Sequence, residues 1–324
     1  MLSELAFSTD DLALTRFAVS PMWEVVTSFR LLATGSAHPV HRPWLEQVRP
    51  RVAAAGLDRG CLAELIPPDG YLADFLTPVP EDPSPSLEAE LAVIRATPAD
   101  HVLADLARLR GRTGSRLQAL RADPRARLAR LCEEIEAYWE LALAPYWAKI
   151  RVVLDADVFH RARQAAERGV GQVFNDLHSS LSWDENTLRI VRRHCGISRE
   201  TTGSGLLLVP SAFAAETLTW SRPPEPPQLA YPARGAGTLW EHRPVKRAEA
   251  IAAVLGRSRT VLLAELEAPA STTELARRTG ISAAGVSQHL TALREAGMVS
   301  AHRAGRSVLY ARTAVAESLL AVTG

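Results

Sequence analysis

A short polar run near the carboxyl end of the chain carries side chains that can donate and accept hydrogen bonds. Residues 285–299 read GVSQHLTALREAGMV, and Ser287, Gln288 and His289 stand together within it. A glutamine amide can bond to N6 and N7 of adenine at once, and a serine hydroxyl can bond to a base edge or a phosphate. The same side chains could simply be solvated, so their role depends on the element that carries them.

The apolar spacing of this run predicts an amphipathic helix. Val286, Leu290 and Leu293 follow one another at i, i+4 and i+7, which places them on one helix face. Ser282 is the expected N-cap of a helix over 283–296. The polar side chains of the run must then point away from the buried stripe.

Other helices and a hairpin are predicted around this helix. The expected helices cover 246–256, a segment from the N-cap Ser258 to a stop at Pro269 with Leu262, Leu263 and Leu266 buried, and a segment from the capping box of Ser271 and Glu274 to Gly280. After Gly297, MVSAHR and SVLYART alternate apolar and polar residues around a short turn, which predicts a two-stranded wing. The order of helices, a turn of ~3 residues, a further helix and a wing is that of a winged helix-turn-helix.

The outer side of the helix over 283–296 and the wing together form the predicted DNA-binding surface. In a helix-turn-helix the second helix enters the major groove, and small residues such as Ala284 let it approach closely. Arginines of the helix and wing suit phosphates, or a minor groove at the wing tip. The candidate DNA-binding residues are Ser282, Ala284, Ser287, Gln288, His289, Thr291, Arg294, His302, Arg303 and Arg306.

Residues 246–313 resemble the winged helix-turn-helix of the ArsR/SmtB class of bacterial repressors. The resemblance rests on TELARRTGISAAGVSQHLTALREAGMVSAHRAGRSVLY. It implies a dimeric repressor that binds double-stranded DNA of a particular sequence. The helices over 246–256 and in TAVAESLLAV could supply a dimer contact, because the first is rich in alanine and apolar on one side.

The chain departs from this class where metal-sensing members bind their metal. Those members carry cysteine in the helix before the recognition helix, or His, Asp and Glu ligands in a final helix. Here STTELAR has no cysteine, and TAVAESLLAVTG has no histidine and one acidic residue, Glu317. Because thiolate and clustered imidazole ligands are absent, we expect no metal site and no cofactor.

The rest of the chain predicts an α+β fold with a mostly helical N-terminal body. Residues 1–168 read as mostly helical, with helix-like spacing over 86–121 and 124–150 and another helix ending at Gly169. The short segments VGQVFNDL, TLRIV, GLLLVP, ETLTW and QLAYP predict a small, largely antiparallel sheet. A Pro-rich break over 221–237 sets the expected domain boundary, with an N-terminal domain of residues 1–237 and the winged helix-turn-helix in 238–324.

Composition narrows the class of protein further. Of the net charge of +1, residues 241–324 contribute +4 and the remainder −3, which fits an anionic partner for the tail. Cys61, Cys132 and Cys195 are far apart in the sequence, which argues against a disulfide framework and against a CxxC metal site. The chain lacks an apolar run of ~18 residues and a signal-peptide pattern, so we expect a cytoplasmic protein without a membrane partner.

Motifs that could indicate catalysis are weak. Asp176, His178 and Ser179 are neighbours in sequence, which triad residues rarely are, and we interpret them as polar residues of a turn. His194 and Cys195 lie side by side, and a cysteine in this setting is interpreted as structural. The glycines of TTGSGLLLVP precede a strand, not a helix, which argues against a phosphate loop. We therefore predict no enzyme.

The sequence leaves several functions open for the body. Two segments, FSTDDLALTRFAVSPMWEVVTSFRLL and GSGLLLVPSAF, are similar to an N-terminal extension found before such winged helices in regulators of GC-rich bacteria. This resemblance does not assign an activity to the body. All seven Trp and all seven Phe lie before residue 241, in a core or around a pocket. We expect a homodimeric regulator whose body binds a small-molecule effector. The alternatives are a regulatory enzyme tethered to DNA, or an interaction scaffold whose winged helix binds protein.

Overall fold

The structure is a computed structural model that forms two compact units. It describes residues 2–34, 39–109, 113–191, 198–200, 204–220, 225–240, 248–304 and 307–321. The first unit contains Met1–Arg42, Gly56–Ile135 and Val153–Gly237, and the second contains Pro43–Ala55, Glu136–Val152 and Thr238–Gly324. The sequence predicts that residues 1–237 and 238–324 are separate folding domains. This stays a prediction.

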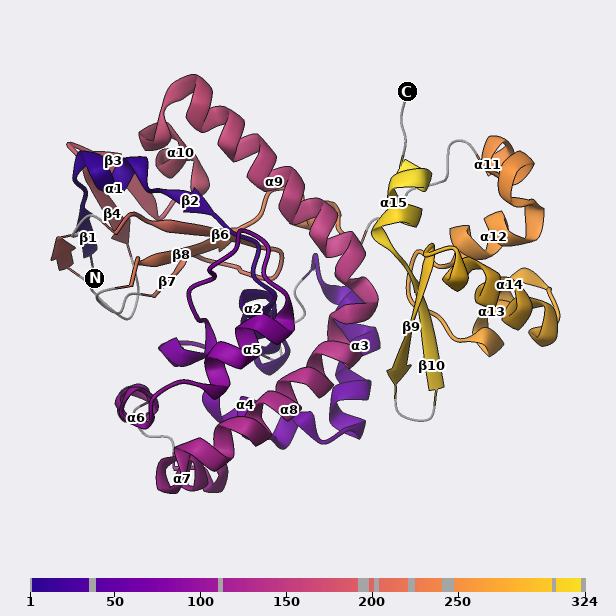
Figure 1. Ribbon diagram of the computed structural model, residues 1–324, viewed down its shortest axis with the longest axis horizontal. Coiled ribbons are helices and arrows are strands. Elements are labelled where there is room, and N and C mark those ends of the chain that lie inside the picture. Colours follow the sequence, from indigo (N-terminus) through magenta and orange to yellow (C-terminus); the bar gives the residue numbers. More distant parts are fainter. Residues whose placement is uncertain are drawn as a thin grey trace. The chain divides into compact units, whose positions relative to one another are not determined.

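Helices dominate residues 1–168, as predicted, and a further helix extends to residue 177 (Figure 1). They are α1 (Thr9–Ala13), α2 (Pro21–Ala33), α3 (Arg42–Ala54), α4 (Cys61–Leu65), α5 (Leu87–Arg95), α6 (Ala99–Arg108), α7 (Ser115–Ala122), α8 (Pro124–Ala142), α9 (Trp147–Arg168) and α10 (Val170–Leu177). The helix expected over 124–150 ends early. A 3-10 turn, η3 (Ala144–Tyr146), interrupts it, because Pro145 has no N–H to continue the helical hydrogen bonds.

The described strands of the body form two sheets instead of the single sheet expected, and the first is largely antiparallel and contains TLRIV as its only predicted segment. Its order is β3 (Leu181–Asp184), β4 (Thr187–Val191), β1 (Leu2–Ala6) and β5 (Ser198–Glu200). The β3–β4 and β1–β4 pairs are antiparallel, and β1–β5 is parallel. Glu185 and Asn186 have φ of 46° and 61°, so a two-residue turn with left-handed backbone closes the β3–β4 hairpin.

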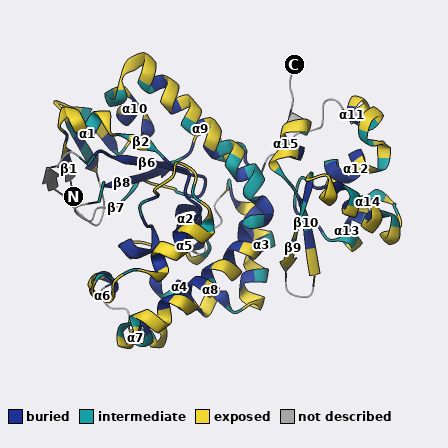
Figure 2. Cartoon of the chain, viewed as in Figure 1, coloured by how far each residue is buried: buried dark blue, intermediate teal, exposed yellow. Residues whose placement is uncertain are grey.

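The second sheet combines parallel and antiparallel pairs, which the sequence did not predict. Its order is β2 (Arg16–Phe17), β6 (Leu207–Ser211), β8 (Gln228–Pro232) and β7 (Leu218–Trp220). The β2–β6 and β6–β8 pairs are parallel, and β7–β8 is antiparallel. All of β6 is buried, as is β8 except for its last residue (Figure 2). Continuous apolar runs of this kind are typical of strands covered on both faces.

The segment VGQVFNDL is a helix, and its expected place in a strand is wrong. It forms α10, which begins after Gly169, whose φ is +84°. Val173, Phe174 and Leu177 are buried, and this i, i+1, i+4 spacing is a helix face rather than the alternation of a strand. Phe174 packs with Phe7 and Trp183 in the core of the first unit.

Buried carboxyl groups tie α2 to the elements around it. Glu24 accepts a hydrogen bond from the Ala212 backbone (3.0 Å), and Glu90 accepts from the Met22 backbone (2.8 Å) and the Ser20 hydroxyl. Burial is the main cause that raises the pKa of each carboxyl, to about 8. Both side chains are therefore neutral at neutral pH, and they act as hydrogen-bonding parts of the core.

The tail has the predicted order of helices, joint and wing. It contains α11 (Ala248–Leu255), α12 (Arg257–Glu265), α13 (Thr272–Thr279), α14 (Ala283–Glu295), β9 (Val299–Ala304), β10 (Ser307–Arg312) and α15 (Ala314–Ala321). Leu262, Leu263 and Leu266 are buried, as predicted. Ser258 is not an N-cap, because Gly256 with φ of +83° occupies that position and α12 begins one residue before Ser258. The α+β fold class is confirmed.

Candidate nucleic-acid interface

Side-chain caps and a left-handed glycine define the joint between α13 and α14. The Ser271 hydroxyl accepts from the Glu274 backbone (3.3 Å), but the Glu274 carboxylate bonds to Arg278. Of the predicted capping box, only the hydrogen bond to the Ser271 hydroxyl is therefore present. Gly280 ends α13 with φ of +72°, which a residue with a side chain rarely adopts.

The start of α14 is packed tightly against the joint. The Ser282 hydroxyl accepts from the Gly285 backbone (3.2 Å), which confirms the predicted N-cap. A Cβ atom at Gly285 would lie 3.1 Å from Ile281 Cγ2 and 3.2 Å from Ser282 Oγ. Glycine at this position thus keeps both the cap and the packing of Ile281 undisturbed.

One face of α14 is buried and the opposite face is exposed. Val286, Leu290 and Leu293 lie in the core of the winged helix-turn-helix, at most 2% exposed. The predicted contact residues of the helix lie on its outer side: Ser282, Ala284, Ser287, Gln288, Thr291 and Arg294 are exposed, and His289 is half-buried. The Thr291 hydroxyl donates to the Ser287 carbonyl (3.0 Å) and keeps acceptor capacity.

The wing is fixed to the helices by backbone and arginine contacts. Strands β9 and β10 pair antiparallel, and Tyr310 exchanges two backbone hydrogen bonds with Ala270. Arg312 donates to the carbonyls of Leu263 (2.6 Å) and Ala264 at the end of α12. These contacts set the direction of the wing relative to α14.

The predicted contact residues of the wing have different surroundings. Arg303 is exposed, as a phosphate contact requires. The His302 ring is half-buried and lies 2.8 Å from Ser300 Oγ and 3.3 Å from the Glu140 carboxylate. Arg306 lies outside the described residues.

Arg277 is a further candidate that the sequence analysis missed. It is exposed in the last turn of α13, next to Arg278, which pairs with Glu274. The first helix of a helix-turn-helix crosses the DNA backbone, where an arginine suits a phosphate. The signal in the sequence that could have indicated this residue is the adjacent basic pair Arg277 and Arg278.

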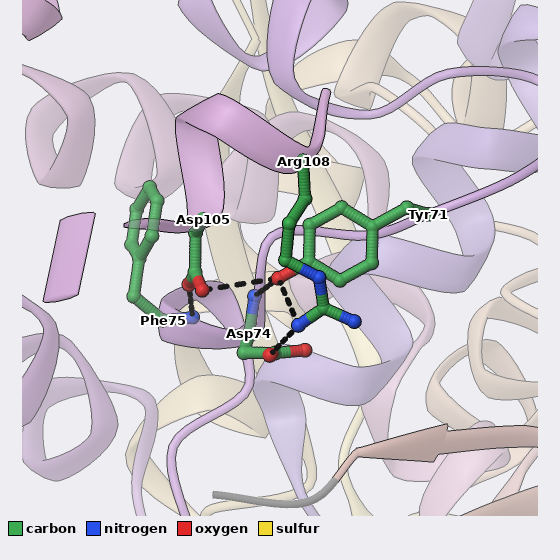
Figure 3. Close-up of polar contacts among 5 residues, drawn as sticks. All are labelled: Tyr71, Asp74, Phe75, Asp105 and Arg108. Carbon is green, nitrogen blue, oxygen red and sulfur yellow. Dashed lines mark hydrogen bonds and ion pairs between the residues drawn. The ribbon is translucent and has the colours of Figure 1, made fainter. Parts of the chain in front are cut away.

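A cluster of titratable side chains in the first unit serves the fold. Tyr71 donates to the Asp105 carboxylate (3.0 Å), and Arg108 donates to Asp74 (2.8 Å) and lies over the Tyr71 ring (Figure 3). Asp105 also accepts from the Phe75 backbone (2.8 Å). Burial, together with the neighbouring carboxylates, raises the pKa of Tyr71. These bonds fix the 3-10 turn η2 (Asp74–Leu76) against α6.

The sequence neighbours considered for catalysis have separate partners. Asp176 accepts from Gln164 and Gln172, while His178 Nδ1 lies 2.8 Å from Ser180 Oγ. His194 and Cys195 lie outside the described residues. In the described part of the chain, no three His, Cys, Asp or Glu side chains gather where a metal ion could bind. In the same part, no helix is long and apolar enough to span a membrane.

Two protein families match parts of the chain. Residues 249–300 match a helix-turn-helix domain family, and residues 95–237 match a family of unknown function (DUF5937). Neither the curated proteins nor the solved structures contain a match. The first match covers α11 to the start of the wing, and the second covers most of the remaining body.

The fold and the domain match together define the class of protein. The tail is a winged helix-turn-helix with a buried stripe and an exposed polar face on its second helix. The chain is a DNA-binding transcription regulator of the winged helix-turn-helix kind, with an uncharacterised N-terminal domain.

Proposed function

We propose that the chain is a sequence-specific regulator of the ArsR type that reads the major groove with α14. The observation that carries this proposal is the exposure of Ser287, Gln288 and Thr291 on the face opposite Val286 and Leu290. Gln288 reads adenine, and Ser287 and Thr291 bond to base edges or phosphates. Arg294 and Arg303 neutralise phosphates.

The regulator acts as a homodimer that represses transcription. A single recognition helix reads a few base pairs, too few to select one operator among ~10⁶ competing sites, whereas two copies read a pseudo-palindrome. The flanking helices of the tail offer apolar side chains for a contact between copies: Val254 of α11 is 83% exposed and Val315 of α15 is 59% exposed.

The body senses a small apolar or amphipathic effector and does not act as an enzyme. Its mass is not needed for DNA binding, and its aromatic residues include the fully buried Trp23 and Trp44. Trp23 bonds to Gln228 on β8 (3.0 Å), so a rearrangement of the sheet would alter its fluorescence. A metabolite library that changes neither tryptophan emission nor DNA affinity of the full chain would remove this part of the proposal.

Selection from a random pool of duplexes tests the DNA-binding proposal. The full chain is incubated with the pool, and bound duplexes are sequenced over successive rounds. We expect a pseudo-palindromic motif whose half-sites lie about one helical turn apart, ~10 base pairs. A pool that stays random would contradict sequence-specific binding, and a single half-site would contradict the dimer.

A further inference from the structure

The outer face of α9 carries an apolar stripe that is open to solvent. Phe159 is 72% exposed and Val152 is 47% exposed, and both lie on the same side of the helix. Around Phe159 the exposed residues Ala156, Ala162 and Ala166 are small. A single exposed apolar residue is ordinary, but an exposed phenylalanine among alanines on one helix face allows another helix to approach closely.

The opposite face of α9 anchors the helix to the body. Leu154, Asp157 and Arg161 are at most 4% exposed. The Asp157 carboxylate accepts from the Tyr231 hydroxyl (2.7 Å) and lies 3.7 Å from Arg161 Nε. The helix is thus fixed in rotation, and the Phe159 side is its outward face.

The charges of α9 are self-complementary about Phe159. In an antiparallel pair of identical helices that cross at this residue, a side chain a given number of positions before it faces the side chain the same number of positions after it on the other copy. Asp155 then faces Arg163 of the second copy, and Arg151 faces Glu167 of the second copy.

The uncharged positions of the stripe match in the same register. Ala156 faces Ala162 of the second copy and Val152 faces Ala166 of the second copy, so small side chains meet where the helices are closest. Arg163 already pairs with Glu167 in its own helix (2.7 Å). When the two helices pair, the Arg163–Glu167 ion pair lies beside Asp155 and Arg151 of the second copy. The four charges then alternate in sign.

We propose that a second copy of this chain docks on α9, through an antiparallel α9–α9 contact centred on Phe159. This inference deepens the proposed function, since it rests on the dimer and names the surface of the body that forms it. The paired stripe, from Val152 to Ala166, is about 21 Å long at the helical rise. A contact of this length joins the bodies of the dimer directly.

Sedimentation equilibrium of the full chain without DNA tests the contact. In Phe159→Asp a carboxylate would meet its own copy across the two-fold axis, and we expect the dimer dissociation constant to rise by about tenfold or more. The matched control is Leu103→Asp, which places the same charge on a 41% exposed leucine of α6 and should leave the constant unchanged. Circular dichroism checks that both variants keep the helical content of the wild type.

A charge swap makes the test specific for the register. Asp155→Arg and Arg163→Asp alone each place like charges opposite one another at two symmetric sites, and each should weaken the dimer. The double variant restores opposite charges and should return the constant to within about threefold of the wild type. A swap that does not restore the dimer would contradict the register.

The inference and the proposed function fail in different ways. A wild type that sediments as a monomer, or Phe159→Asp that dimerises like the wild type, overturns the α9 contact whatever the DNA result. A random pool that yields no motif, while Phe159→Asp dissociates the dimer, overturns the DNA-binding proposal and leaves the α9 contact in place.

Discussion

Gln288 carries the specific part of the proposed recognition. It is exposed on α14, and its amide has the donor and acceptor that adenine requires. We expect Gln288→Ala to relax the preference at one base position by about 1–3 kcal/mol and to leave the other positions unchanged. Binding to duplexes that differ from the selected motif by one base pair measures this.

The matched control for that variant is Gln118→Ala, which removes an exposed glutamine from α7 in the body. It should change neither the preferred bases nor the affinity. Equal preferences of Gln288→Ala and the wild type at every position would mean that this side chain does not read DNA.

Glu24 should make the stability of the fold depend on pH. Its pKa is raised from 4.5 to about 8 by burial, so the folded state holds a proton that the unfolded state has lost between these values. The stabilisation is fully present below about pH 4.5 and is lost as pH rises toward 8. Glu24→Gln is uncharged at every pH, so its free energy of unfolding should increase relative to that of the wild type by on the order of 3 kcal/mol between pH 5 and pH 8.

Urea unfolding at both pH values measures the difference, with Glu88→Gln on the exposed side of α5 as the control. The control should show the pH dependence of the wild type. A constant difference between Glu24→Gln and the wild type would contradict a neutral carboxyl in the core.

Single residues near the joint show what sequence can and cannot predict. The cap at Ser282 was predictable, because serine before an apolar helix repeat satisfies a free backbone N–H. Ser258 has the same place before an apolar helix repeat, but Gly256 is the N-cap and α12 begins before Ser258. Glu274 had the spacing of a capping box, yet Arg278, one helical turn away, competes for its carboxylate.

At the scale of elements, the wing should contribute affinity without base preference. Changing Arg303 and Arg306 to alanine removes two charges that suit phosphates, so binding should weaken for every sequence. The slope of log affinity against log salt should fall by about 0.9 for each lost phosphate contact. Titrations at several salt concentrations measure the slope.

The control removes two exposed arginines, Arg125 and Arg130, from α8 and so changes the net charge equally. Its slope should remain that of the wild type. An unchanged slope in the wing variant would show that the wing does not touch DNA.

Element type was predictable where the apolar period was strict. The i, i+4, i+7 spacing of the apolar residues in α14 fits only a helix with one buried face, and these residues are buried in the structure. In α10 the apolar residues Val173 and Phe174 are adjacent, and a run of eight residues fits a buried strand as well as a short helix. Packing against Trp183 and against Phe7, which is distant in sequence, selects the helix.

At the scale of the whole molecule, DNA affinity should not depend on metal. STTELAR, which forms the start of α13, has no cysteine, and zinc prefers thiolate and imidazole ligands. Adding zinc and then a chelator to the full chain on its selected duplex should leave the affinity unchanged. A shift that the chelator reverses would contradict this prediction.

Sheet topology was the part of the molecule least accessible to sequence. The segments of β6 and β8 were recognised as strands, but their parallel pairing depends on a contact between residues far apart in the chain. β2 has only two residues, too few for a periodic pattern. The self-complementary charges of α9 were visible in the sequence, but their meaning required the structure to show which face is exposed.

The central claim is that α14 selects DNA by sequence. The most direct measurement compares the affinity of the full chain for its selected duplex with that for a scrambled duplex of the same length and composition, at one salt concentration. We predict a ratio of about 10³ or more, the range of specific regulators. Equal affinity for the two duplexes would contradict the claim.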